Sequence, residues 1–276
     1  MQSVPRSNHI NREAIYMTTE NITYPKLKFS KDANAKLEGI KAWLPISKPK
    51  IYSLSLLSGF TCPGAKDCQA WAIKDKTTGK TRIQQGKHAI FRCFSASQEV
   101  MYPTVYEQRK YNTDLLLKKS LEQITQILMN SIPHDADIIR IHVGGDFFSR
   151  DYMESFYDVA RFYKNIKFYA YTKSVDWMQE LEYLRPKNFS MNASYGSRKD
   201  SIIDEFNLKS AVVVNHPDDT DLPIDHDEYY AINNAGSFAL LLHGTQPKDS
   251  EASEALKRMR KEGIKFAYSN KKVGVA

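Results

Sequence analysis

Short β-prone runs alternate with helical runs through most of this sequence, and that rhythm restricts the possible fold more than any other feature. Apolar residues at helical spacing separate the runs, most clearly at 107–130 and 149–164. Strands joined by helices of this length pair in parallel, because the chain must cross back before the next strand begins. The sequence therefore predicts an α/β fold, either an incomplete (β/α) barrel or an open, mainly parallel sheet of six or seven strands. The expected strands lie at 51–57, 138–143, 166–171, 189–193, 211–215, 238–242 and 264–268.

The chain has 276 residues, a length that one (β/α) domain of about 250 residues can account for. Residues 1–45 show little periodicity beyond one short helix at 31–43, and we expect them to form an N-terminal extension. Residues 46–276 are expected to form a single α/β domain. A cysteine-containing insertion is expected at about 58–100, with a turn-rich hairpin at 77–86.

Composition excludes several protein classes. No apolar run approaches the roughly 20 residues that a membrane-spanning helix requires, and residues 1–20 lack the apolar core of a secretory signal. The three cysteines are an odd number, which disfavours a disulfide framework. The sequence therefore predicts a cytoplasmic protein with no membrane contact and with reduced thiols.

The three cysteines are the leading candidates for a metal site. Cys62 and Cys68 follow the first expected strand, and Cys93 lies 25 positions after Cys68. Ligand sites in parallel α/β folds form at the carboxyl ends of the strands, where this loop would lie. Three thiolates on one centre leave an open coordination position, as an iron–sulfur cluster or a catalytic metal requires. Two alternatives are a structural zinc site with His88 as its fourth ligand and three small buried thiols without a metal.

A glycine turn after the second expected strand is the first candidate for a cofactor contact. Gly144 and Gly145 allow close backbone approach, and Asp146 precedes a helix whose N-terminal amides could face an anion. His142, inside the strand, is a candidate catalyst or a hydrogen-bonded core histidine. Strand alternation predicts that Arg140 and His142 point the same way.

Polar residues also follow the next two strands. Lys173 is a candidate catalytic residue, and Asn192 and Ser194 are candidate cofactor contacts, because all three are expected at the same end of the sheet. An acidic run at 216–228 has oxygen and imidazole groups suited to a divalent ion, or it is a solvated loop.

Positive charge gathers around the cysteines. Residues 48–93 contain nine Lys or Arg against only Asp67 and Asp75, within a chain of net charge +7. Such a segment is typical of nucleic-acid contact, and also of an ordinary solvated loop.

Seven short segments of the sequence stand out together: TCPGA at 61–65, FRCFSASQE at 91–99, RIHVGGDFF at 140–148, FYAYTKS at 168–174, SAVVV at 210–214, LPIDHD at 222–227 and LLHGTQP at 241–247. In these segments the chain resembles the gene product 88 family of phage, plasmid and bacterial proteins. The resemblance runs from about residue 50 to residue 248, and it implies membership of a family without implying a particular activity.

A looser resemblance is to radical S-adenosylmethionine enzymes. It implies an incomplete (β/α) barrel, a [4Fe–4S] cluster held by Cys62, Cys68 and Cys93, and a Gly-Gly-acid turn, here 144–146, that holds the amino group of the cofactor. That superfamily usually places its three cysteines in one short loop, whereas Cys93 is far from Cys68 in this sequence.

Three functional hypotheses follow. The leading hypothesis is an enzyme in which the cluster binds S-adenosylmethionine at its open iron and cleaves it reductively to a radical, with an unknown substrate. The alternative is a nucleic-acid-binding or processing protein that contacts phosphates through 48–93 and holds zinc or no metal. A third is a metal-dependent hydrolase built on Asp225, His226 and Asp227.

Overall fold

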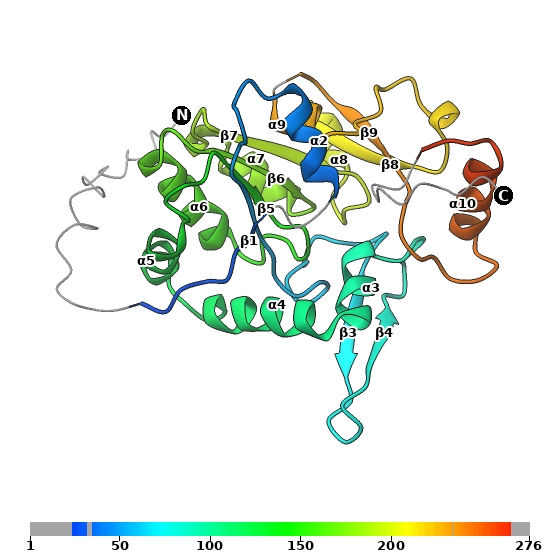
Figure 1. The fold of residues 1–276 in the computed structure, drawn as a ribbon, viewed down its shortest axis with the longest axis horizontal. Coiled ribbons are helices and arrows are strands. Elements are labelled where there is room, and N and C mark those ends of the chain that lie inside the picture. Colours follow the sequence, from blue (N-terminus) through cyan, green and yellow to red (C-terminus); the bar gives the residue numbers. More distant parts are fainter. Residues whose placement is uncertain (1–23, 32–34, 234, 266–276) are drawn as a thin grey trace, which may run out of the picture.

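Seven strands form one sheet in the computed structural model, which describes residues 24–31, 35–233 and 235–265 (Figure 1). Their order across the sheet is β1-β2-β5-β6-β7-β8-β9. The strands are β1 (Ser30–Lys31), β2 (Ile51–Leu54), β5 (Ile138–Ile141), β6 (Lys167–Thr172), β7 (Phe189–Ser194), β8 (Ser210–Val214) and β9 (Phe238–Leu241).

The six strands from β2 to β9 in this sheet are parallel and follow one another in chain order, and β1 pairs antiparallel with β2 at the edge. The sheet is open and does not close into a barrel. The predicted fold class is therefore confirmed in its open-sheet form. A consequence of the parallel arrangement is that the loops after β2, β5, β6 and β7 meet at one edge.

Helices connect the strands, as the rhythm of the sequence requires. They are α2 (Ala35–Trp43), α3 (Phe94–Met101), α4 (Pro103–Leu116), α5 (Leu121–Ser131), α6 (Arg150–Phe162), α7 (Val175–Glu180), α8 (Ser201–Glu205), α9 (Tyr229–Ile232) and α10 (Glu251–Lys261). Within the described residues, no helix is both long and apolar enough to cross a bilayer.

Side-chain alternation along the strands divides the core between the two faces of the sheet. On β6, Phe168 and Ala170 belong to the larger core, which also includes buried residues of α5 and α6. Tyr169 belongs to a smaller core on the other side, with Leu37 and Ile40 of α2. The helix of the expected N-terminal extension thus packs against the main sheet, while residues 1–23 lie outside the described residues.

Helix α6 anchors the larger core. Its N-cap residue, Ser149, accepts a hydrogen bond from the amide of Tyr152 at 3.2 Å, which satisfies one of the otherwise unpaired amides of the first turn. Tyr152, Phe156 and Val159 recur at helical spacing and are fully buried. This stripe faces the strands and fixes β5 against the helix layer.

The prediction of one helix at 107–130 is wrong. The chain forms α4 and α5 instead, separated at Lys118, whose φ is +60°. Ser120 then starts α5 with a capping box, in which its hydroxyl accepts from the amide of Gln123 and the side chain of Gln123 accepts from the amide of Ser120. The helical spacing of apolar residues continues through the break between α4 and α5, so the sequence pattern did not indicate that the helix ends there.

The predicted common direction of Arg140 and His142 is also wrong. Strand β5 ends at Ile141, and His142 has a left-handed φ of +68°, which interrupts the alternation. The His142 ring packs against Phe147 at 4.9 Å in the larger core. Arg140 instead lies over the ring of Tyr171 at 5.4 Å, on the side of the smaller core.

The segment at 58–100 contains a separate two-stranded hairpin of β3 (Ala70–Lys74) and β4 (Thr81–Gln85), followed by α3. The hairpin was expected at 77–86, but its first strand, β3, begins and ends before that range. The hairpin projects away from the main sheet (Figure 1). Of the last expected strand, Ile264 and Lys265 are not in a strand, and the remainder lies outside the described residues.

Replacing Phe156 with Ala is expected to lower the free energy of unfolding by about 3–5 kcal/mol, because a fully buried ring leaves a cavity. Phe162, on the same helix, is 46% exposed, and Phe162→Ala should cost about 0.5 kcal/mol or less. Urea unfolding of the two variants measures the difference. Equal losses would contradict the assignment of the α6 stripe to the core.

Candidate functional site

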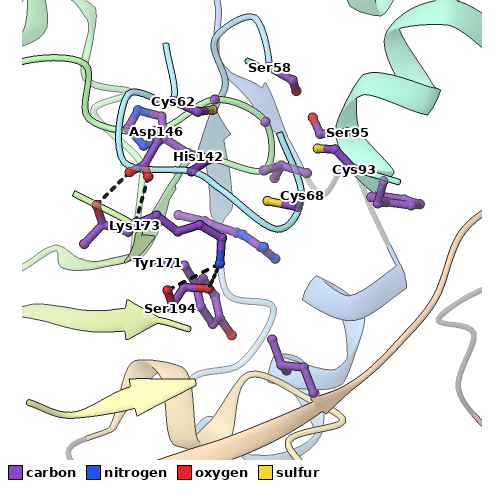
Figure 2. A pocket seen from close by; sticks show the side chains of 18 of the residues that line it. Ser58, Cys62, Cys68, Cys93, Ser95, His142, Asp146, Tyr171, Lys173 and Ser194 are labelled. Atoms are coloured by element: carbon purple, nitrogen blue, oxygen red, sulfur yellow. Dashed lines mark hydrogen bonds between the residues drawn. The ribbon is translucent and has the colours of Figure 1, made fainter. Parts of the chain in front are cut away.

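A cavity of about 270 Å³ lies at the carboxyl end of the parallel strands. Its walls come from the loops after β2, β5 and β6, the last residue of β7, the end of β9 with His243, and the start of α3 (Figure 2). Sequence-distant segments therefore meet at one small-molecule-sized site. Its lining residues are Ser58, Cys62, Ala65, Cys68, Cys93, Phe94, Ser95, Arg140, His142, Val143, Gly144, Gly145, Asp146, Tyr171, Thr172, Lys173, Ser194, Leu240 and His243.

All three thiols line this cavity. Cys62 and Cys68 come from the loop after β2, and Cys93 is the residue that precedes α3 (Figure 2). The three residues are half-buried and form no disulfide. The structure thus brings Cys93 to the same cavity as the two earlier cysteines, despite their separation in sequence.

Burial keeps these thiols protonated in the ligand-free protein. It raises the pKa of Cys62 well above its usual value and that of Cys68 to about 11, although Lys173 opposes the shift at Cys68. Burial also raises the pKa of Cys93, against the backbone amides of Ala96 and Ser95. A metal centre would have to displace these protons, so its binding would be pH-dependent.

A buried ion pair fastens the start of α3 to the cysteine loop. Arg109 of α4 and Glu99 of α3 are 5% and 0% exposed, with 2.9 Å between Nη1 and Oε1. The same Glu99 oxygen accepts from the amide and the hydroxyl of Ser58, at 3.0 and 2.9 Å. Arg109 also donates to the hydroxyl of Ser95 at 2.6 Å. One ion pair therefore links the loop that carries Cys62 to the helix that begins beside Cys93.

The glycine turn after β5 packs directly against this network. A Cβ on Gly144 would lie 2.0 Å from the Ser95 hydroxyl and 2.8 Å from the Arg109 guanidinium carbon. Gly145 has a φ of +84°, which favours glycine. Only a residue without a side chain fits at Gly144, so the turn, α3 and the ion pair are mutually dependent.

Asp146 joins the turn to the end of β6. Its carboxylate accepts a hydrogen bond from the amide of the next residue, Phe147, at 2.7 Å. It also accepts hydrogen bonds from the Thr172 hydroxyl at 2.7 Å and from the Lys173 amide at 2.8 Å (Figure 2). Burial raises the pKa of Asp146 to about 6, although these hydrogen bonds lower it. A carboxyl group with this pKa can change protonation near neutral pH.

Lys173 links Asp146 to the end of β7, because its backbone amide binds Asp146 and its side chain binds Ser194. Its ammonium group donates to the Ser194 hydroxyl at 2.7 Å and to the carbonyls of Ser194 and Tyr195. Lys173 and Ser194 both line the cavity, as their positions after the strands predict. Asn192 does not line it. Its amide is buried within the sheet and donates to the carbonyls of Ala170 and Ala231.

His142 borders the cavity as a neutral ring. Burial, together with the charge of Arg140, lowers its pKa to about 3. Its Nε2 lies 3.0 Å from the Tyr152 hydroxyl, while Nδ1 is buried with no hydrogen-bond partner in the described part of the chain. The ring therefore does not carry a proton as a cation near neutral pH.

A second buried ion pair, which was not anticipated from the sequence, borders the cavity through Arg140. Arg140 contacts Glu228 with 3.1 Å between Nη1 and Oε1, and the Tyr171 hydroxyl donates to the other Glu228 oxygen at 3.0 Å. Asp225 accepts from the amides of Asp227 and Ala231. These carboxylates of the acidic run thus bind backbone and side-chain donors of the protein, and they lie outside the cavity lining.

Metal-ligand geometry is limited. In the described ranges, no group of three or more His, Cys, Asp and Glu side chains is arranged to hold a metal ion. His88, the fourth ligand considered for zinc, is exposed and is not among the lining residues. The three thiols share a cavity, and the described residues contain no ready-made zinc site of the Cys₃His88 type.

Several contributors to the site escaped the sequence analysis. Ser58, Ser95, Glu99 and Arg109 act through hydrogen bonds that no spacing rule predicts. Glu99 and Arg109 lie 10 positions apart on different helices, and only their placement on otherwise buried faces hints at a pair.

Comparison with known proteins gives one match. A family model described as gene product 88 matches residues 23–261. Neither the curated proteins nor the solved structures include a significant match to this chain.

Asp146→Asn is expected to remove a pH dependence of stability. The folded pKa of about 6 lies above the usual value of 3.8, so the folded state binds the proton more tightly than the unfolded state. The wild-type protein should therefore lose about 2–3 kcal/mol relative to the variant as the pH rises from 4 to 7. Urea unfolding across this range measures the difference. A constant difference would contradict the raised pKa.

Arg109→Met should lower the free energy of unfolding by about 3–5 kcal/mol, because it leaves Glu99 buried without its cation. Lys74→Met provides the control, since Lys74 pairs with Glu107 of the same helix at an exposed position. That change should cost less than about 1 kcal/mol. Similar losses in the two variants, measured by urea unfolding, would contradict a special role for the buried pair.

Proposed function

We propose that this chain, which belongs to the gene product 88 family through a match over residues 23–261, is a radical S-adenosylmethionine enzyme. Support for this function comes from the cavity and not from the family match. In this proposal Cys62, Cys68 and Cys93 hold a [4Fe–4S] cluster. The supporting observation is that all three thiols line one cavity with the glycine turn at the carboxyl end of a parallel sheet.

The donor types suit such a group, although no three of the described thiol, imidazole and carboxylate side chains are already arranged to hold a metal ion. Three cysteine thiolates hold a cluster of this type and leave one iron open for a further ligand. The three thiols are free, and their residues are half-buried. Bound to S-adenosylmethionine at the open iron, the cluster would supply the single electron from which radical chemistry begins.

The remaining residues would position the cofactor. Gly144 and Gly145 bring backbone close to the cavity, since nothing projects from them. Ser194 presents a hydroxyl that Lys173 orients by donating to it. His142 would turn its Nδ1, which has no hydrogen-bond partner among the described residues, toward the ligand. Asp146 would hold the turn to β6 through the hydrogen bonds to Thr172 and Lys173.

Anaerobic reconstitution with iron and sulfide tests the proposal. The wild-type protein should turn brown and bind about four irons per chain, as one [4Fe–4S] cluster requires. Cys62→Ser, Cys68→Ser and Cys93→Ser should each lose most of the iron. Ser194→Ala changes the same cavity without removing a thiol, and it should keep the iron while weakening S-adenosylmethionine binding, measured by calorimetry.

A folded wild-type protein that stays colourless and iron-free would overturn the proposal. Uptake of zinc alone under the same conditions would support instead a structural site at these cysteines. Retention of the full iron content by Cys93→Ser would show that this thiol is not a ligand.

A further inference from the structure

The β3–β4 hairpin is attached directly to the cavity. It follows Cys68, and its return strand leads to Cys93, so both of its ends join segments that line the site. Each strand has five residues, which gives an arm of about 17 Å at ~3.3 Å per residue. Figure 1 shows this arm extending away from the main sheet.

The arm is basic and polar. Lys76, Lys80 and Lys87 are exposed, and none of them forms an ion pair with another described residue. Asp75, the one acid between β3 and β4, instead accepts hydrogen bonds from the turn amides of Thr77 and Thr78. The cationic side chains are thus available to an anionic partner, and the polar tip offers nothing to insert into a membrane.

Exposed aromatic rings lie where the arm meets the body. Phe94 is 37% exposed, lines the cavity and packs against the ring of His243 at 4.9 Å between centroids. Phe60 is 51% exposed within the cysteine loop. Cationic side chains combined with exposed aromatic rings are the features that bind single-stranded nucleic acids, through phosphates and stacked bases respectively.

We propose that the hairpin and Phe94 bind a single-stranded nucleic acid and present one of its nucleotides to the cavity. A base within a duplex could not enter a cavity of this size without leaving its stack, which favours a single strand. This inference rests on the proposed function only for the reaction that follows binding. The binding itself needs no cluster.

Fluorescence anisotropy with the full-length, iron-free protein tests the proposal. The probes are labelled oligo(dT) and oligo(rU) strands of about 20 nucleotides, a length that exceeds a typical single-strand site. The wild-type protein should bind one of them more tightly than a duplex of equal length. The triple variant Lys76→Glu, Lys80→Glu and Lys87→Glu should bind on the order of tenfold or more weakly at low salt, with a salt dependence shallower by about two counterions.

The control variant also replaces three lysines with Glu, but at the amino ends of the strands, which lie opposite the cavity. Lys164, Lys167 and Lys187 are exposed near the starts of β6 and β7, and replacing all three with Glu should leave binding within about twofold of wild type. Phe94→Leu should weaken binding without changing the salt dependence, because it removes a ring and no charge.

Three results would overturn the proposal: no binding of either single strand at low salt, tighter binding of the duplex, or equal losses in the two charge variants. Because iron is absent throughout, failure of the cluster proposal would leave this measurement unaffected. Conversely, iron uptake without nucleic-acid binding would sustain the cluster proposal and reject this one.

Discussion

The buried ion pair between Glu99 and Arg109 is the interaction on which the site depends. Two buried charges are stable only when they are paired and hydrogen-bonded, and here Ser58 and Ser95 add hydrogen bonds to the pair. The second carboxylate oxygen of Glu99 has no hydrogen-bond partner among the described residues. The pair thereby ties the loop after β2 to the start of α3. It acts together with the backbone hydrogen bonds from Ile90 and Phe91 to the Asp67 carbonyl, which hold the segment before Cys93 beside the residue that precedes Cys68.

The glycine turn makes this arrangement specific. Gly144 leaves room for the Ser95 hydroxyl and the Arg109 guanidinium, so the turn after β5 and the cap of α3 occupy one shared volume. Asp146 then joins the turn to β6, and Lys173 joins β6 to β7. The carboxyl ends of four adjacent strands are therefore linked through side chains, which explains why a cavity formed at this edge has a defined lining.

Much of this could be predicted from the sequence, because the relevant signals are local. Alternating strand and helix patterns predicted the parallel sheet, and residues directly after strands, such as Lys173 and Ser194, were correctly expected at one edge. Local sequence patterns gave wrong predictions where a left-handed backbone conformation, or a contact between residues far apart in the sequence, determined the structure. The left-handed His142 ended β5 early, Lys118 divided an apparently continuous helix, and Asn192 was directed into the sheet. The ion pair between Glu99 and Arg109 could be identified only from the three-dimensional structure, because the two residues lie on different helices.

The central claim is that Cys93 lies at the same cavity as the loop that carries Cys62 and Cys68. Crosslinking with dibromobimane, which fluoresces only after reaction with two neighbouring thiols, tests this claim on the folded, metal-free protein. The account predicts a fluorescent crosslink, identified by peptide mass spectrometry, between Cys93 and one of the two other cysteines, and its loss in urea. Crosslinks that join only Cys62 to Cys68, with Cys93 modified separately, would contradict it.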